Sequence, residues 1–173
     1  MVALLDQRVV LIPAAQAERL ATRRRAADDS LWALLDSVKD PEVPVLSLWE
    51  LGVLQDVYRE GSCVTVVITP TYSGCPALHA MEQAVRECLV DAGHSNVRVV
   101  TRLSPPWTTD WLSTTARRVL YEYGIAPPTA DAIGCPRCGS THTARISEFG
   151  STACKALHRC GDCGEPFDYF KPL

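Results

Sequence analysis

The stretches Cys135-Pro136-Arg137-Cys138-Gly139 and Cys160-Gly161-Asp162-Cys163-Gly164 decide the fold of about the last 40 residues. Each stretch places two sulfurs one tight turn apart, and the glycine after the second cysteine permits the positive φ that such a turn requires. Two such turns supply four thiolates, which suits a closed tetrahedral metal site. The spacing predicts a structural zinc ion held by Cys135, Cys138, Cys160 and Cys163, although a tetrahedral site made only of sulfur also accepts iron.

The region between the two motifs is typical of a zinc ribbon. Strands are expected at 143–147 and 156–159. A module of this size cannot be held together by burial alone, so the metal is expected to supply much of its folding free energy. Cys154 lies six residues before the second motif, and a closed four-thiolate site does not need it. We expect Cys154 to pack inside the ribbon as a small apolar side chain.

Length and charge exclude several classes of protein. The chain has 173 residues and a formal net charge of −3, which allows one domain plus a small module and argues against a broad nucleic-acid interface. No apolar stretch reaches the roughly 20 residues that cross a bilayer, and Asp6 and Arg8 interrupt the N-terminal apolar segment too early for a secretory signal. We therefore expect a cytoplasmic protein that binds neither nucleic acid nor membrane. In that compartment the eight cysteines favour metal ligation over disulfides.

Before the ribbon, helical and strand patterns alternate, which predicts an α+β fold. The three expected segments are an N-terminal arm or helix (1–27), a mixed α/β domain (28–127) and the four-cysteine ribbon (131–173), with Pro127-Pro128 as a linker. The elements expected in the middle segment are a helix over 28–39, strands over 53–58 and 63–69, a helix over 76–92, a strand over 96–103 and a helix over 110–123.

Cys75 is the most reactive cysteine that the sequence predicts. Pro76 suits the first position of a helix, which would place Cys75 at the N-cap, where the helix dipole favours thiolate over thiol. The sulfur would then serve as a soft metal ligand or a nucleophile. The competing interpretation is a cysteine that fills a small space under a loop. Cys63 and Cys88 are expected to be small buried apolar side chains instead.

Several motifs of the middle segment, taken in order, resemble a known family. They are Asp40-Pro41-Glu42-Val43, Glu50-Leu51-Gly52, Thr71-Tyr72-Ser73-Gly74-Cys75-Pro76 and Pro105-Pro106-Trp107. Together they resemble the small iron–sulfur assembly domain of SufT-type proteins, over about residues 30–126. The added ribbon, with Cys163-Gly164-Glu165-Pro166-Phe167 and Phe170-Lys171 near its end, resembles the PaaD family of the bacterial phenylacetate-degradation pathway. That family is encoded with the multicomponent phenylacetyl-CoA epoxidase.

This resemblance implies an accessory protein that matures the epoxidase rather than an enzyme. The implied partners are the reductase component, which carries an iron–sulfur cluster, and less directly the di-iron oxygenase component. Cys75 matches the characteristic cysteine of the assembly domain and Asp40 its characteristic acidic residue. Glu50 departs from the aspartate usual in the broader family but keeps its charge. A cluster commonly takes four ligands, so one thiolate would share iron or a cluster transiently, across a homodimer or with a client.

Two other functions remain open from the sequence. Iron in the ribbon, cycling between oxidation states, would make the chain a rubredoxin-like electron-transfer subunit of the oxygenase. Cys75 could instead act as a nucleophile, with His79 one helical turn further on as the local base. His79 is more typical of a surface histidine, and the chain carries no phosphate loop or dinucleotide fingerprint.

Overall fold

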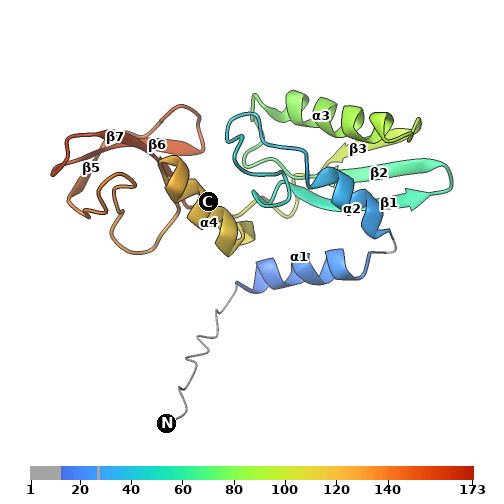
Figure 1. Cartoon of the computed structure of the whole chain (residues 1–173), viewed down its shortest axis with the longest axis horizontal. Helices are drawn as coiled ribbons and strands as arrows, with labels where there is room; N and C mark the ends of the chain where they lie inside the picture. Colours follow the sequence, from blue (N-terminus) through green and yellow to red (C-terminus); the bar gives the residue numbers. More distant parts are fainter. Residues whose placement is uncertain (1–12, 27) are drawn as a thin grey trace, which may run out of the picture.

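A three-stranded sheet forms the centre of the first part of the molecule (Figure 1). The computed structural model describes residues 13–26 and 28–173. β1 (Leu54–Glu60) and β2 (Cys63–Ile68) form an antiparallel hairpin, and Gly61 takes the positive φ of 59° that its tight turn requires. β3 (Val97–Thr101) lies parallel to β2, so the chain must cross over between them. Helix α3 (Leu78–Asp91) makes that crossover.

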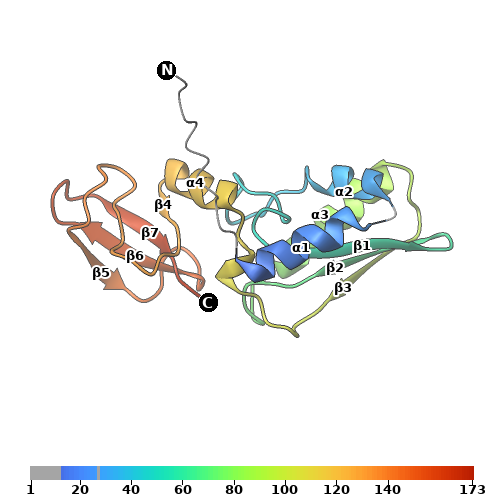
Figure 2. The same cartoon turned by 90° about the horizontal axis from the view of Figure 1, so that it is seen from below.

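Helices cover the sheet and enclose its core. α2 (Asp29–Leu35) packs beside α3, and their apolar faces meet the inward side chains of β2 in one hydrophobic cluster. α1 (Ala14–Arg24) runs along β1 (Figure 2). This helix lies within the segment expected to be an arm or a helix, whereas residues 1–12 and 27 of that segment lie outside the described residues. In the part of the chain that the structure describes, no helix has the length and apolar character needed to cross a membrane.

The C-terminal part is a four-stranded sheet in the order β4-β7-β6-β5. β5 (Thr143–Ser147), β6 (Lys155–Cys160) and β7 (Pro166–Phe170) are antiparallel neighbours, and β4 (Ile125–Ala126) lies parallel to β7. β5 and β6 form near their expected positions, while β7 was not expected. β4 precedes the linker prolines, so the sheet of the ribbon includes residues that come before residue 131, where the ribbon was expected to begin. The predicted α+β class, with a mixed domain followed by a ribbon, is confirmed.

Two helices differ from the prediction. The helix expected to reach residue 39 ends at Leu35 and continues only as turns. The helix expected over 110–123 is a short 3₁₀ turn, η1 (Thr109–Trp111), followed by α4 (Thr114–Tyr123). Ser113 separates them because it is extended and its hydroxyl accepts the Ala116 amide at 2.9 Å as an N-cap. Gly124 ends α4 in the left-handed conformation that favours glycine.

The two parts share a core. Phe170, at the end of β7, is completely buried in the hydrophobic cluster of the first part, where its ring lies 5.8 Å from that of Trp107. Cys154 belongs to the same cluster. The carbonyl oxygen of Leu173 accepts the amide of Thr109 at 3.2 Å. The ribbon therefore packs against the first domain rather than hanging from a free linker.

Candidate metal sites

The four predicted zinc ligands come together in the ribbon. Their ligand atoms all lie within 4.8 Å of one another, with Sγ–Sγ distances of 3.7 Å between Cys135 and Cys163 and 3.6 Å between Cys138 and Cys160. Zinc–sulfur bonds of about 2.3 Å in a tetrahedron imply sulfur–sulfur distances of about 3.8 Å, so the donor set fits one Zn²⁺. Cys135 and Cys160 are buried, while Cys138 and Cys163 are exposed.

The backbone around these cysteines is arranged for thiolates. Gly139 and Gly164 have φ values of 76° and 78°, and their amides donate to the carbonyls of Cys135 and Cys160 at 2.8 and 3.1 Å. At the second turn the amide of Cys163 is the main donor to the Cys160 sulfur and holds the pKa of that thiol down at about 6. Although the Ser140 amide acts in the opposite direction, the Cys160 sulfur raises the pKa of the Cys138 thiol to about 12, so a metal ion displaces that proton when it binds.

Cys75 lies in a tight turn before α3 and not at its N-cap, which corrects the prediction. The amide of Leu78 donates to the Cys75 carbonyl at 3.2 Å, and the helix begins only at Leu78, with Ala77 as the N-cap. Partial burial raises the pKa of the Cys75 thiol, although the Ala77 amide acts in the opposite direction; the charges of Asp40 and Cys154 raise it further. The surroundings of Cys75 therefore disfavour its thiolate form, whereas a bound cation would favour it.

Asp40 lies in the Pro-rich loop after α2 and is 5% exposed. Its Oδ1 accepts the amides of Glu42 and Val43 at 2.9 and 2.8 Å, which folds the loop around the carboxylate. Burial raises the pKa of this carboxyl, and the two amides only partly offset the shift. Among the described residues, none donates a hydrogen bond to Oδ2.

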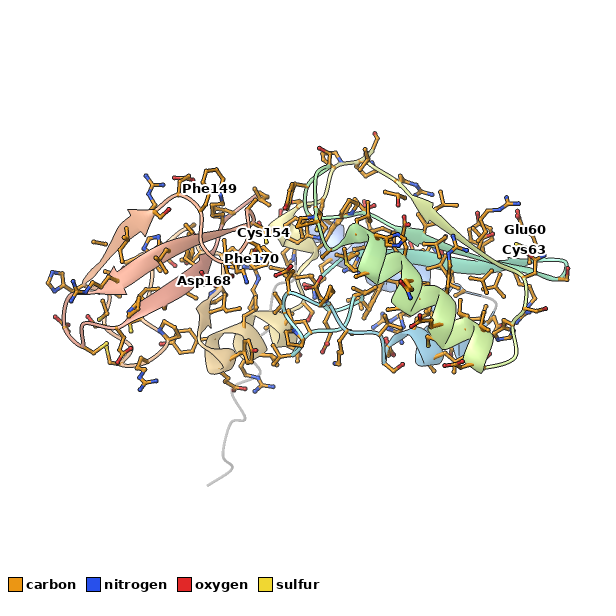
Figure 3. The ribbon with its side chains drawn as sticks, turned by 90° about the horizontal axis from the view of Figure 1, so that it is seen from above. Glu60, Cys63, Phe149, Cys154, Asp168 and Phe170 are labelled. Carbon is orange, nitrogen blue, oxygen red and sulfur yellow. The ribbon has the colours of Figure 1, made fainter. Side chains whose placement is uncertain are left out.

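Cys75 and Asp40 line one small cavity of about 20 Å³, at the junction of the two parts of the molecule. The structure also places a second cysteine there, Cys154, which the sequence led us to expect inside the ribbon. Cys154 is buried, and Figure 3 shows it with Phe170 on the side of the ribbon that faces the first domain. No local signal could have revealed this, because Cys154 and Cys75 are far apart in sequence and meet only through the docking of the ribbon.

The remaining quoted motifs build the walls behind this cavity. Gly52 has a φ of 85°, and a Cβ on it would lie 2.8 Å from the Cβ of Trp111 and 3.2 Å from Nε1 of Trp107. The indole of Trp107 also donates to the carbonyl of Leu51, at 3.2 Å. Glu50 accepts the amide and hydroxyl of Ser47 at 2.8 and 3.0 Å, so its carboxylate closes a turn of the loop.

The other candidate residues lie away from the cavity. Cys63 lies near the tip of the β1–β2 hairpin, at the opposite end of the first domain from Cys154 (Figure 3). Cys88 is half-buried, and its sulfur donates to the carbonyl of Leu34 at 3.4 Å. Both are therefore less buried than we expected. His79 is exposed and does not line the cavity with Cys75, so the structure brings no base to that thiol from α3.

Known proteins resemble this chain in both parts. Residues 28–101 match the family described as iron–sulfur cluster assembly protein, and residues 126–171 match the PaaD zinc β-ribbon domain. A domain of unknown function from Bacillus anthracis has the same fold, with a TM-score of 0.50 and 24% identity, over 60% of this chain and 95% of that one.

A protein of Escherichia coli (strain K12), whose name describes it as a candidate component of 1,2-phenylacetyl-CoA epoxidase, is 49% identical over 162 residues. The match covers 89% of this chain and 98% of that protein, so it extends over far more than either part of the molecule alone. The chain therefore belongs to the PaaD family.

Proposed function

We propose that this chain is a non-enzymatic accessory protein of phenylacetyl-CoA epoxidase, which delivers iron or an iron–sulfur cluster to a component of that complex. The reductase component is the preferred client, and the di-iron oxygenase component is the second. Cys75 is the residue that carries the iron, and Asp40 supports it. The eight cysteines are free thiols, which suits action in the reducing cytoplasm.

The observation that carries this proposal is the placement of Cys75 beside a buried carboxylate in a cavity too small for an organic substrate. An enzyme of phenylacetyl-CoA would need a pocket of several hundred Å³ around its reactive group. A nucleophilic cysteine would need a base within hydrogen-bond reach, whereas burial and, to a smaller extent, the charge of Asp40 raise the pKa of this thiol. A thiol next to a carboxylate is better suited to holding a cation than to attacking a carbonyl.

The ribbon serves as a structural and docking module in this proposal. The four sulfurs of Cys135, Cys138, Cys160 and Cys163 would hold zinc, which when bound supplies folding free energy and no redox chemistry. The exposed apolar side chains of Ile146 and Phe149, on and just after the edge strand β5, offer a surface for a client protein.

The test exchanges Cys75 for alanine in cells that grow on phenylacetate, with Cys88→Ala as the matched control. We expect Cys75→Ala to lower the iron and acid-labile sulfide bound per purified reductase component, and the epoxidase activity with it. Cys88→Ala should leave both unchanged, because Cys88 lies outside the cavity. Normal cluster content in the Cys75→Ala cells would refute the proposed mechanism.

One observation favours a second candidate, a rubredoxin-like electron-transfer subunit. Cys138 and Cys163 are exposed, so an iron ion held by the four sulfurs would lie close to a docked redox partner. Metal analysis of the purified protein separates the two functions. A coloured protein with one iron and no zinc per chain supports electron transfer, because iron then replaces zinc in the ribbon, whereas one zinc per chain excludes it.

A further inference from the structure

We propose that Cys154 joins Cys75 and Asp40 in a second metal site, for one divalent ion, at the junction between the ribbon and the assembly-like domain. The inference rests on the proposed function and deepens it, because it names the iron-carrying site and adds a ligand from the other part of the chain. The three side chains come from the loop after α2, the turn before α3 and the residue before β6.

The size of the cavity favours a single ion. Its volume of about 20 Å³ is close to the space that one water molecule needs, roughly 10–15 Å³ by the same kind of measure. A single divalent ion that has lost its hydration shell and is held directly by side chains fits such a space. A four-iron cluster is several times larger and commonly takes four protein ligands, which the cavity does not offer.

The chemistry of the lining favours a cation of intermediate softness. Two thiols and a carboxylate face one small space, and Glu42 adds a second carboxylate at its edge. Thiolates select iron, zinc and similar metals over magnesium and calcium, while carboxylates accept iron readily. Oδ1 of Asp40 is held by two backbone amides, so its position is fixed and the second oxygen is left without a donor from the described residues.

Contacts within the ribbon fix the position of Cys154. The hydroxyl of Thr152 lies 3.1 Å from its sulfur, and its carbonyl accepts the amide of Lys171 at 3.0 Å. Next to it, the ammonium of Lys155 is buried and lies 3.6 Å from Asp168, whose charge offsets that cation close to the proposed site. The position of Cys154 therefore depends on a folded ribbon.

The second site differs from the ribbon site in its degree of preassembly. Among the described residues, only the four ribbon cysteines form a group of three or more whose ligand atoms all lie within 4.8 Å of one another. Ligation in the cavity therefore needs the side chains to come closer together, and a change of rotamer would move a cysteine sulfur by about 3 Å. A site whose ligands must first move together binds its ion more weakly than the preassembled four-cysteine site. Weaker binding suits an ion that is delivered to a client protein.

Cobalt(II) is a suitable probe because sulfur-to-cobalt charge transfer reports the number of thiolate ligands. The reduced full-length chain is first loaded with one zinc per chain and is then titrated with Co²⁺ without oxygen. We expect one further Co²⁺ per chain, with zinc retained. Cys75→Ser and Cys154→Ser should each lower the charge-transfer absorbance by about half, while Cys88→Ser should leave it unchanged.

X-ray absorption on the cobalt-loaded, unsubstituted protein provides the same count without a variant, and the expected result is two sulfurs per cobalt. Any one of three results would overturn the inference. They are a count of one sulfur per cobalt by X-ray absorption, an unchanged charge-transfer band in Cys154→Ser, and the lack of a Co²⁺ charge-transfer band in the unsubstituted protein. The outcome is independent of the cellular test. If Cys75→Ala abolishes client maturation but no two-sulfur cobalt site forms, the proposed function stands and this inference fails. If a two-sulfur cobalt site forms but client maturation is normal in the Cys75→Ala cells, this inference stands and the proposed function fails.

Discussion

Arg19 offers a sharp test of how α1 is attached to the molecule. Its Nη1 donates to the carbonyl of Trp111 at 2.8 Å, and its Nη2 donates to those of Trp49 and Leu54 at 3.0 and 2.9 Å. The guanidinium also lies 4.1 Å from the centre of the Trp49 ring. Burial lowers the pKa of this side chain to about 10, so it remains a cation at neutral pH. One buried side chain therefore joins α1 to three separate backbone segments.

The magnitude follows from those contacts. Hydrogen bonds from a charged donor contribute about 1.5–3 kcal/mol each, so three at the lower end give about 4–5 kcal/mol. The contact with the indole ring adds roughly 0.5–1 kcal/mol. Water that enters the space vacated by the side chain recovers part of the lost free energy. We expect Arg19→Ala to lower the free energy of unfolding by about 3–4 kcal/mol.

Urea unfolding of the zinc-loaded protein measures the change, and Arg24→Ala is the matched control. Arg24 is on the same helix but exposed, and substitutions at such positions usually stay within about 0.5 kcal/mol. Arg19→Lys should lose most of the same stability, because one ammonium cannot reproduce the planar fork that reaches three carbonyls. The reasoning is refuted if Arg19→Ala and Arg24→Ala differ by less than about 1 kcal/mol.

Three further predictions test the walls of the cavity and the ribbon. Gly52→Ala should lower the free energy of unfolding by at least about 2 kcal/mol, from the positive φ and the contact with Trp111, and a loss below about 1 kcal/mol in urea would contradict this. Burial raises the folded pKa of Asp40 above its unfolded value, so its contribution to stability falls as the pH rises from about 4 and stays lower at pH 7. Asp40→Asn should therefore have a free energy of unfolding at pH 7 equal to or above that of the unsubstituted protein, and the difference should vanish near about pH 4. A variant that is less stable than the unsubstituted protein at pH 7 but not near about pH 4 would argue against this. Chelation of the ribbon metal should abolish hydrogen-exchange protection of the β5–β7 amides while β1 and β2 stay protected; unchanged protection in β6 would show that the ribbon folds without metal.

Local patterns were sufficient for much of this molecule. The two cysteine turns are predictable because a tight turn and its glycine are properties of five adjacent residues. The β1–β2 hairpin is predictable for the same reason, since strand alternation and Gly61 lie side by side in the sequence. The strand β7 was missed because it contains Pro166 and an aspartate, and it becomes a strand only through pairing with β6 and β4 on either side.

The state of Cys75 shows where local reasoning fails. The pair Cys75-Pro76 indicates a helix start, and the helix dipole alone would lower the pKa of the thiol. The structure moves the helix start to Leu78 and buries the sulfur among groups from elsewhere, so that burial first and the charge of Asp40 second raise its pKa. Arg19 was missed for the same reason, since its three acceptors belong to a loop, to β1 and to η1, which the sequence cannot place beside α1.

The two candidate metal sites are physically linked through β6 and β7. Cys160 ends β6 as a ribbon ligand, and Cys154 immediately precedes the same strand at its other end. Phe170, which ends β7, is buried in the core of the first domain near the cavity. Because the ribbon is too small to stay folded by burial alone, loss of its metal would release Cys154 and Phe170 together. The cavity beside Cys75 would then open and lose one of its two thiols. The ribbon metal therefore does more than stabilise a docking module, since the second site can form only in a chain whose ribbon is already loaded.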